Sequence, residues 1–507
     1  MTDTEQPNSH PANAWWLQIE TTIDRGIEWA LQFCFVQADA GIVKWGQYAW
    51  AGLLLVGGTV LWAYILNWGH ISFQYHDWAE GIGHRLAFLQ DAVRTNQLPL
   101  NMPDASALRN VTDRYLAVAD TIFSPQVYML RYMTLGGFVV FNTVLLYGLG
   151  FLGMLRIARR YSISPVPFSA MFLALAFNGR ITDLIVVGDI HWAGYFLLPW
   201  FVYFMLQAVE EPVGWVWTLE VAVLFLLVFL QGSFHMFVVG LTFMFLLGLF
   251  NVRLLVPMLK AGTFAILASM VRILAPATVS GRFDVAFLSG FDSALQALSS
   301  MVDLKLAVRD QVFRNTPLSP LGWWEMDHYI GLMGLLFVLG FGLWLWARSE
   351  SGKDNLREFA IPVTGLVLLS IGRVFKPISM LGIPLLSSQR VSTRFFVLAL
   401  VVMAIVAAIG MQRYLRSRSV SRPLKLAFLA GLVAMGNDIW QHEKSWRVAH
   451  LPDMFPARQI DLSLAYVANH PDPPYVAALV AGLIISVLTL FVLGWMAYRE
   501  VRAGSLT

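Results

Sequence analysis

Two histidines and two carboxylates lie close together in QYHDWAEGIGHR, residues 74–85, directly after a long apolar run. Apolar residues at positions 82, 86, 89 and 93 recur at helical spacing and predict an amphipathic helix over 78–95. On that helix Asp77, Glu80 and His84 lie opposite the apolar stripe, and His76 lies at its edge. A carboxylate fixed in this way can act as a general base on a hydroxyl group, and Asp77 is the candidate.

The same residues allow two other interpretations. Asp77 as N-cap and Glu80 three residues later form a capping pair for the helix that follows. The spacing of His76, Glu80 and His84 is also compatible with a metal site, but the stretch offers no obvious further ligand. Capping does not exclude catalysis, so the sequence leaves both open.

Two more polar clusters adjoin apolar runs. In NGRITDLIVVGDIHW, residues 178–192, Asp189 can orient the imidazole of His191 or supply a second carboxylate facing Asp77. The alternative is a solvated turn in which Asp189 caps the next helix. The second cluster, GWWEMDHYIG at 322–331, stands where a span is expected to begin, and acids also favour a helix N-terminus for purely structural reasons. Its ionisable residues are Glu325, Asp327 and His328.

Basic residues gather near the ends of apolar runs on the same predicted side. Lys and Arg normally favour the inner side of a membrane, so their presence in a short outer connection indicates a specific role. Guanidinium groups bind phosphate bidentately, and the cluster predicts a phosphate or pyrophosphate site. Pairing with the outer acids or with lipid headgroups is the structural alternative. The residues are Arg272, Arg373, Lys376, Arg390 and Arg394.

The composition of the chain predicts the helices that must position these side chains. The chain has 507 residues, of which 57% are hydrophobic and 13% are charged, about half the charged fraction of a soluble protein. Repeated apolar runs predict an all-α polytopic membrane protein of about twelve transmembrane helices, with amphipathic helices in the first outer loop. The expected spans are 48–68, 132–156, 163–178, 190–209, 213–231, 235–255, 257–275, 328–347, 358–374, 393–412, 424–439 and 476–498.

Lys and Arg in the other short loops place both termini in the cytoplasm. The predicted organisation is a cytoplasmic tail over 1–46 with an interfacial amphipathic helix, a transmembrane domain over 47–498 and a cytoplasmic tail over 499–507. The outer face is then built by the long connections 69–131, 276–327 and 440–475.

Charge and cysteine content narrow the partners further. The net charge of +3 is spread over loops and favours no nucleic acid. The lone Cys34 excludes an intramolecular disulfide framework and a cysteine-based metal cluster.

An ordered series of motifs resembles the GT-C superfamily of glycosyltransferases and, within it, bacterial membrane proteins grouped as YfhO-like. Two departures stand out: NMPDASALRNVTDRYLAVADTIF replaces the usual Trp-Asn-Pro and Gly-Tyr-Pro elements, and Asp189 stands where Gly is more frequent. The similar segments are HDWAEGIGHRLAFLQDAVRTNQLPL, SPQVYMLRYMTLGGFVVFNTVLLYGLGFLGMLRIARR, DIHWAGYFLLPW, GWWEMDHYIGLMGLL and SSQRVSTRFFVLAL.

The resemblance implies transfer of a sugar from a polyprenyl-phosphate donor to an acceptor at the outer face of a bacterial cytoplasmic membrane. The family's catalytic acid carries over onto Asp77, with Asp189, His191 or Glu80 assisting, and its phosphate-binding arginines onto Arg390 and Arg394. Some relatives look metal-dependent, so the resemblance is compatible with Mg²⁺ or Mn²⁺ between Asp77 and Asp189. Membrane lipid and a lipid-linked sugar are the expected partners.

Two other function classes fit the composition. A non-catalytic membrane subunit or scaffold would keep the fold and dock a protein partner, which the replaced loop elements favour. A lipid or solute transporter would carry ionisable groups at mid-membrane, whereas most charges here gather at one predicted face. The glycosyltransferase remains the leading hypothesis.

Overall fold

The helices of this protein follow the apolar runs of its sequence. The computed structural model describes residues 11–37, 41–279, 281–282, 286–314, 321–343, 355–383, 386–418 and 420–504. Within these ranges the chain forms helices, turns and isolated β-bridges, and no strand. Helices satisfy their backbone hydrogen bonds internally, as a bilayer requires. The expected all-helical class is confirmed.

Among the described residues, six helices are long and apolar enough to cross a membrane, and one bent pair makes a possible seventh. The bent pair, α10 (Val252–Ala268) and α11 (Met270–Ala277), turns by 65° at its break. The chain is therefore an integral membrane protein with six or seven candidate spans. The six are Gly41–Ile65, Leu135–Tyr161, Pro165–Val187, Ile190–Glu210, Arg394–Ser417 and Pro473–Ala503.

The structure does not show the expected twelve spans, although a helix occupies each expected range. Both α8 (Trp215–Leu230) and α9 (Phe234–Leu249) have 16 residues, fewer than the ~20 that a bilayer normally requires. Two helices, α14 (Gly331–Phe337) and α16 (Ala360–Ser370), are shorter still. Length is sufficient in α19 (Arg422–Ser445), but its sequence is more polar.

The third expected span, 163–178, is longer than predicted. Helices α5 (Pro165–Ala176) and α6 (Gly179–Val187) together form one candidate span. The side-chain oxygen of Asn178 accepts a hydrogen bond from the backbone N–H of Ile181 at 3.3 Å and so starts α6 directly after α5. Most of the segment 178–192, for which a solvated turn was one interpretation, is thus buried helix.

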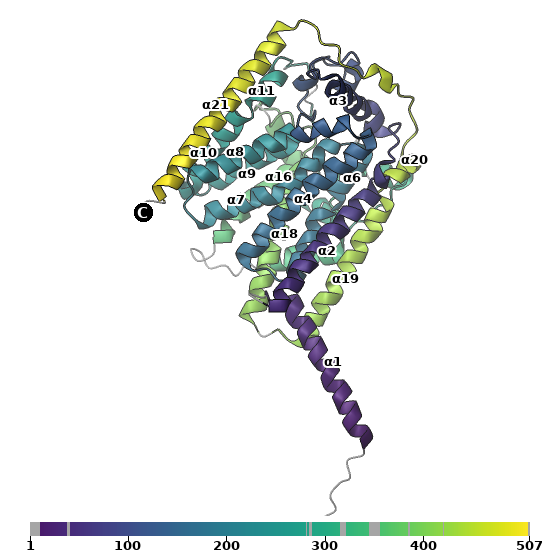
Figure 1. Ribbon diagram of the computed structural model, residues 1–507, viewed down its shortest axis with the longest axis vertical. Coiled ribbons are helices and arrows are strands. Elements are labelled where there is room, and N and C mark those ends of the chain that lie inside the picture. The colour runs from purple at the N-terminus through teal and green to yellow at the C-terminus, as the bar shows by residue number, and fades with distance from the viewer. Residues whose placement is uncertain are drawn as a thin grey trace, which may run out of the picture.

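The core of the bundle surrounds α18 (Arg394–Ser417), whose apolar window is entirely buried. Its neighbours include α5, α7 (Leu198–Glu210), α9 and α16. By contrast α2 (Gly41–Ile65) and α21 (Pro473–Gly504) run along opposite edges of the bundle in Figure 1 and are mostly exposed. These two helices offer apolar side chains to lipid.

The connections between the long helices are built from short helices, many of them at one end of the bundle (Figure 1). The expected helix over 78–95 is divided into a π-helical turn, η2 (Trp78–Ile82), and α3 (Gly83–Thr95). The remaining elements are α1 (Pro11–Phe35), η1 (Asn67–Gly69), η3 (Ala105–Leu108), η4 (Tyr115–Ala117), η5 (Pro125–Arg131), α4 (Leu135–Tyr161), η6 (Ile190–Leu197), α12 (Ala294–Ser299), α13 (Arg309–Arg314), η7 (Trp323–Glu325), η8 (Val338–Leu343), η9 (Asn355–Phe359), α17 (Gly372–Ser379), η10 (Val448–His450), α20 (Leu451–Met454) and η11 (Leu462–Leu464).

Candidate functional site

Asp77 directly precedes the π-helical turn η2, and its carboxylate makes no capping hydrogen bond to that turn. Instead, Asp77 Oδ2 lies 3.1 Å from Nδ1 of His76. The His76 ring is held by aromatic contacts with Trp324 and Phe455, at centroid distances of 4.6 and 4.4 Å. Burial alone would lower the pKa of His76, but the Asp77 carboxylate raises it above its usual value. The structure thus pairs Asp77 with an imidazole and does not use it as a cap.

Asp189 is brought to Asp77 by a close backbone approach. The indole Nε1 of the fully buried Trp78 donates to the carbonyl of Val186 at 2.8 Å and fastens the end of α6 to the Asp77 turn. Between them Gly188 has φ 127°, and a Cβ there would lie 2.7 Å from the backbone nitrogen of Trp78 and 3.0 Å from Cβ of Asp77. The residue after this glycine is Asp189, so its carboxylate enters the same site.

Replacing Gly188 with Ala is expected to separate the two aspartates. The substitution combines an unfavourable positive φ with a backbone clash, for which we expect a loss of ~1–3 kcal/mol in unfolding free energy. Thermal unfolding in detergent micelles measures this loss. Gly57→Ala in α2 is the matched control, because a Cβ at Gly57 meets nothing within 4 Å. Equal stability of the two variants would contradict the proposed role of this contact.

A polar pocket of about 480 Å³ opens beside the two aspartates. Its wall comes from the Asp77 turn, the Asp189 turn, the segment 106–120 and one residue of the last long connection. Carboxylates and guanidinium groups therefore face one volume. The charged residues that line it are Asp77, Glu80, Asp120, Asp189, Arg85, Arg109 and Arg458.

Asp189 and Asp120 have different electrostatic surroundings. Burial, and then the charge of Asp77, hold the pKa of the Asp189 carboxyl well above its usual range, although Arg394 acts in the opposite direction. Burial would also raise the pKa of Asp120, but Arg109 and Arg85 outweigh it and hold that pKa well below its usual range. Asp189 thus takes up a proton at a higher pH than an ordinary aspartate does, while Asp120 stays ionised.

Asp120 anchors the basic side of the pocket. Arg85 Nη1 lies 3.2 Å from Asp120 Oδ1, and Arg109 pairs with the other oxygen of the same carboxylate. The Arg85 and Asp120 side chains are 8% exposed, whereas Arg109 is 49% exposed. Across the pocket Arg458 pairs with Glu80 at 2.7 Å. Arg109 and Arg458 are the guanidinium groups with surface free to meet a ligand.

Arg394, predicted as a phosphate ligand, lies in a buried network behind the pocket. Its guanidinium pairs with Glu325, which also pairs with the fully buried Arg180. Burial would raise the pKa of Glu325, but Arg394 and Arg180 outweigh it and lower the pKa to about 2. Arg394 also contacts the ring of His235. This arginine is engaged by protein groups and acts on Asp189 through its charge.

The other predicted phosphate ligands do not line the pocket. Arg373 donates to the carbonyl of Asp292 at 3.0 Å, and Arg390 to that of Ala286 at 3.4 Å, so both lie against the segment 286–292. Lys376 is exposed on α17. Arg272 is fully buried and its guanidinium donates to a set of backbone carbonyls. These belong to Leu116, Val118, Ala119 and Thr121.

The remaining predicted residues lie in separate places. His191 is buried, with Nδ1 3.7 Å from Asp189 Oδ1. His84 is buried, with Nε2 3.7 Å from Oδ2 of Asp104. It does not lie on one helix face with Asp77, as the helical wheel predicted, because η2 interrupts the helix. His328 is buried between the rings of Phe291 and Phe396. Asp327 belongs to a second buried cluster, described below.

The structure does not supply Asp77 and Asp189 with a converging third metal ligand. Among the described residues, one group of three metal-ligating side chains has mutually close ligand atoms, and it comprises Asp183, Asp327 and His442. The third pocket carboxylate, Asp120, is already paired with two arginines. No step of the proposed chemistry is therefore assigned to a metal between Asp77 and Asp189.

An apolar groove of about 470 Å³ lies next to the polar pocket. It is bounded by α3, the segment 123–128, α8, α11 and α21, and its lining includes Leu89, Phe123 and Leu483. A cavity of about 10 Å³ lies against both regions, because it shares the lining residues Arg85 and Asp120 with the pocket and Leu89 with the groove. The polar pocket and the apolar groove thus lie close to each other near α3.

Sequence reasoning missed Arg85, Arg109, Asp120 and Arg458 as pocket residues. Arg85 follows His84 directly, and Arg109 and Asp120 lie in the segment NMPDASALRNVTDRYLAVADTIF, residues 101–123. The sequence does show charged residues in the long outer connections. Their spacing along a loop does not indicate which of them lie close together in the folded protein. No protein-family model, curated protein or solved structure matches this chain.

Proposed function

We propose that this protein is a membrane glycosyltransferase that transfers a sugar from a polyprenyl-phosphate donor to an acceptor hydroxyl. The observation that carries the proposal is the junction of two compartments. A pocket with carboxylates and guanidinium groups lies close to an apolar groove, and a small cavity shares lining residues with both. A lipid-linked sugar phosphate has the same two parts, a charged headgroup and an apolar tail.

The chemistry assigns the two sides of the pocket different tasks. Asp77 accepts the proton of the acceptor hydroxyl as its oxygen forms a bond to the anomeric carbon of the sugar. The bond between that carbon and the phosphate oxygen breaks, and prenyl phosphate leaves with the electron pair. Arg109 and Arg458 stabilise the charge on the departing phosphate. Arg109 and Arg458 are exposed and line the pocket, which supports them as the phosphate ligands in place of Arg390 and Arg394.

The finer topology belongs to the same proposal. We infer twelve membrane-crossing or partly crossing helices in a GT-C-like arrangement within a bacterial cytoplasmic membrane, with cytoplasmic termini and the pocket on the outer side. Support comes from a helix in each expected range and from Lys and Arg in the loops opposite the pocket.

The test uses purified wild-type protein in proteoliposomes with synthetic polyprenyl-phosphate hexoses. Release of prenyl phosphate that depends on the protein and on an added acceptor, such as a mixture of short glycans, is the expected result. If the protein neither binds nor turns over any hexose of the series, the proposal is wrong. Binding without turnover would favour the non-catalytic subunit.

Leu483→Trp is expected to fill the apolar groove. Leu483 lines the groove on α21, and we expect the KM for a long-chain donor to rise about tenfold, which corresponds to ~1.4 kcal/mol. A donor analogue with a very short chain should be unaffected, because it does not reach the groove. Leu488→Trp on the same helix is the control, since Leu488 is 58% exposed and lies outside the groove lining. Equal effects of both variants on the KM would show that the prenyl tail does not bind in this groove.

The pH dependence of sugar transfer should report the protonation of the Asp189 carboxylate. A carboxylate with a raised pKa is protonated at a higher pH than usual, so activity that requires its charge falls as pH drops through that raised pKa and is fully present above it. Asp189→Asn carries no charge at any pH, so it is expected to lower kcat/KM across the whole pH range and to remove the acid limb that the raised pKa sets. An acid limb that stays in place would show that another group sets it.

A further inference from the structure

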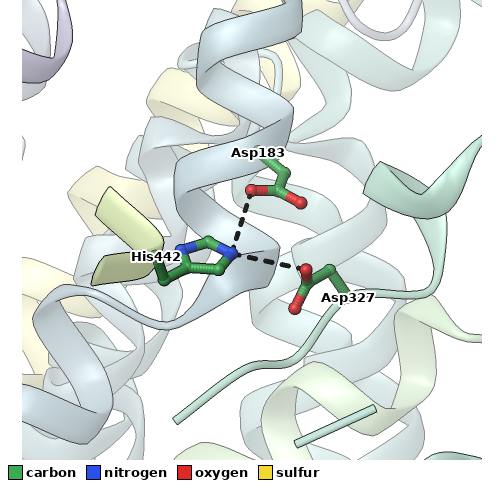
Figure 2. A group of neighbouring side chains, drawn as sticks. All are labelled: Asp183, Asp327 and His442. Atoms are coloured by element: carbon green, nitrogen blue, oxygen red, sulfur yellow. Dashed lines mark hydrogen bonds and ion pairs between the residues drawn. The ribbon is translucent and has the colours of Figure 1, made fainter. Parts of the chain in front are cut away.

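A second cluster of ionisable groups lies inside the bundle, away from the polar pocket. Asp183 comes from α6, Asp327 from the segment before α14 and His442 from the end of α19. All three side chains are 0% exposed. Figure 2 shows the two carboxylates pointing toward the same edge of the imidazole ring. None of the three lines the pocket.

The distances in this cluster fit a shared cation as well as long hydrogen bonds. Nε2 of His442 lies 3.5 Å from Asp183 Oδ1 and 3.4 Å from Asp327 Oδ2. A good N–H···O bond measures about 2.7–3.2 Å. Two ligand atoms bound to one ion at ~2.1 Å and a tetrahedral angle lie about 3.4 Å apart. One ligand atom from each of the three residues lies within 4.8 Å of those of the other two.

Within the described residues, one imidazole faces the three carboxylates of this cluster. Neither carboxylate oxygen of Asp183 has a hydrogen-bond partner in the part of the chain that the structure describes. Among the same residues, His442 is the one ion-pair partner of Asp183, Asp327 and Glu443. Burying an unpaired carboxylate costs several kcal/mol, so such groups normally bind a cation or a proton.

The surrounding residues hold the ligands as in a metal site. His442 Nδ1 lies 3.3 Å from the carboxylate of Glu443, which also accepts from the hydroxyl of Thr182 at 3.0 Å. With Nδ1–H on Glu443, the Nε2 lone pair faces the two aspartates. A carboxylate on the second nitrogen of a ligating histidine is the usual arrangement around protein-bound metals.

Asp327 is oriented by two further donors. Trp323 Nε1 donates to Asp327 Oδ2 at 2.6 Å, and the backbone N–H of Tyr329 donates to Oδ1 at 2.7 Å. The Tyr329 ring also stacks on His442, with centroids 5.1 Å apart. Two of the three ligands are therefore fixed before any ion arrives, which lowers the entropic cost of binding.

We propose that Asp183, Asp327 and His442 bind one transition-metal dication, for which Zn²⁺ fits the ligand types and spacing best. The ion joins α6 to the segment before α14 and to the end of α19. Because the Gly188–Asp189 turn follows α6 directly, the ion holds the helix that leads to one of the two pocket aspartates. The proposal stands whether or not the protein transfers sugars.

Metal content of the purified full-length protein tests the site. Protein purified in micelles and supplied with Zn²⁺, then freed of loosely bound ion, is expected to retain about one Zn²⁺ per chain. Asp183→Asn and His442→Gln should lower the retained zinc at least tenfold. His450→Gln is the matched control, because His450 is 41% exposed and pairs with Asp453. Asp189→Asn should also keep its zinc, and loss of zinc in that variant would move the ion to the pocket and overturn the proposal.

A second measurement does not depend on the folding of the variants. A strong chelator should lower the thermal midpoint of wild-type protein, and added Zn²⁺ should restore it. Co²⁺ in place of Zn²⁺ should give the visible absorption of a tetrahedral cobalt site. Wild-type protein that retains no zinc and is indifferent to the chelator would show that the carboxylates share protons instead, and the proposed metal site would be wrong.

Discussion

Asp77→Asn is expected to lower kcat for sugar transfer by about 10²–10⁴-fold, the usual range for loss of a general base. The donor KM should change little, because Arg109 and Arg458, and not Asp77, are proposed to hold the phosphate. Asparagine keeps the shape of the side chain and its partial contact with His76, so the variant isolates the loss of the basic oxygen. Transfer measured in proteoliposomes under saturating donor gives the comparison.

The same variant separates catalysis from capping. Asparagine is as good an N-cap as aspartate, so a residue that only caps would tolerate Asp77→Asn with full activity and unchanged stability. Asp453→Asn is the control, since Asp453 is 57% exposed, pairs with His450 and does not line the pocket. Activity of Asp77→Asn within threefold of wild type would exclude Asp77 as the base.

Glu325→Ala is expected to produce the largest loss of stability, ~3–5 kcal/mol in the free energy of unfolding. The change leaves two guanidinium groups without their carboxylate, one on the fully buried Arg180 and one on Arg394, which is 13% exposed. A buried charge without a partner costs far more than the ion pair itself contributes. Thermal or denaturant unfolding in detergent micelles is the measurement.

A surface pair provides the control for this prediction. Glu211→Ala removes a partner of Arg160, but Glu211 is 59% exposed, and exposed ion pairs contribute only about 0–1 kcal/mol. Comparing the losses of unfolding free energy in Glu325→Ala and Glu211→Ala separates the effect of burial from the effect of losing an ion pair. If Glu325→Ala were no more destabilising than Glu211→Ala, the buried network could not be fastening α18 to the segment before α14.

The helices were predictable from sequence because each apolar run is long compared with its breaks. The third span shows the limit of that argument: Arg180 and Asp183 interrupt the apolar pattern, so the run seemed to end at 178, yet α6 continues to Val187 with both side chains fully buried. Their partners, Glu325 and His442, come from segments more than a hundred residues away. Hydropathy cannot anticipate charges that are neutralised by distant partners.

The candidate site was predictable in part. Asp189 was expected as a second carboxylate facing Asp77, and the structure places both on one pocket. The basic side differed, because residue type does not decide between a phosphate ligand and an ion pair. Arg394 pairs with Glu325, whereas Arg109 and Arg458, in loops without periodicity, line the pocket. Only tertiary packing distinguishes these cases.

The enclosed position of α18 has a consequence for how the protein is assembled during synthesis. Its main neighbours, α5, α7, α9, η8 and α16, all precede it in the chain. When α18 leaves the insertion machinery, the groups that will cover it have already been translated, and it exchanges lipid for protein without waiting for later helices. A chain that ends shortly after residue 417 and has been released from the ribosome should therefore already contain the packed centre of the bundle, with the two remaining long helices, α19 and α21, added to its outside in the full-length protein.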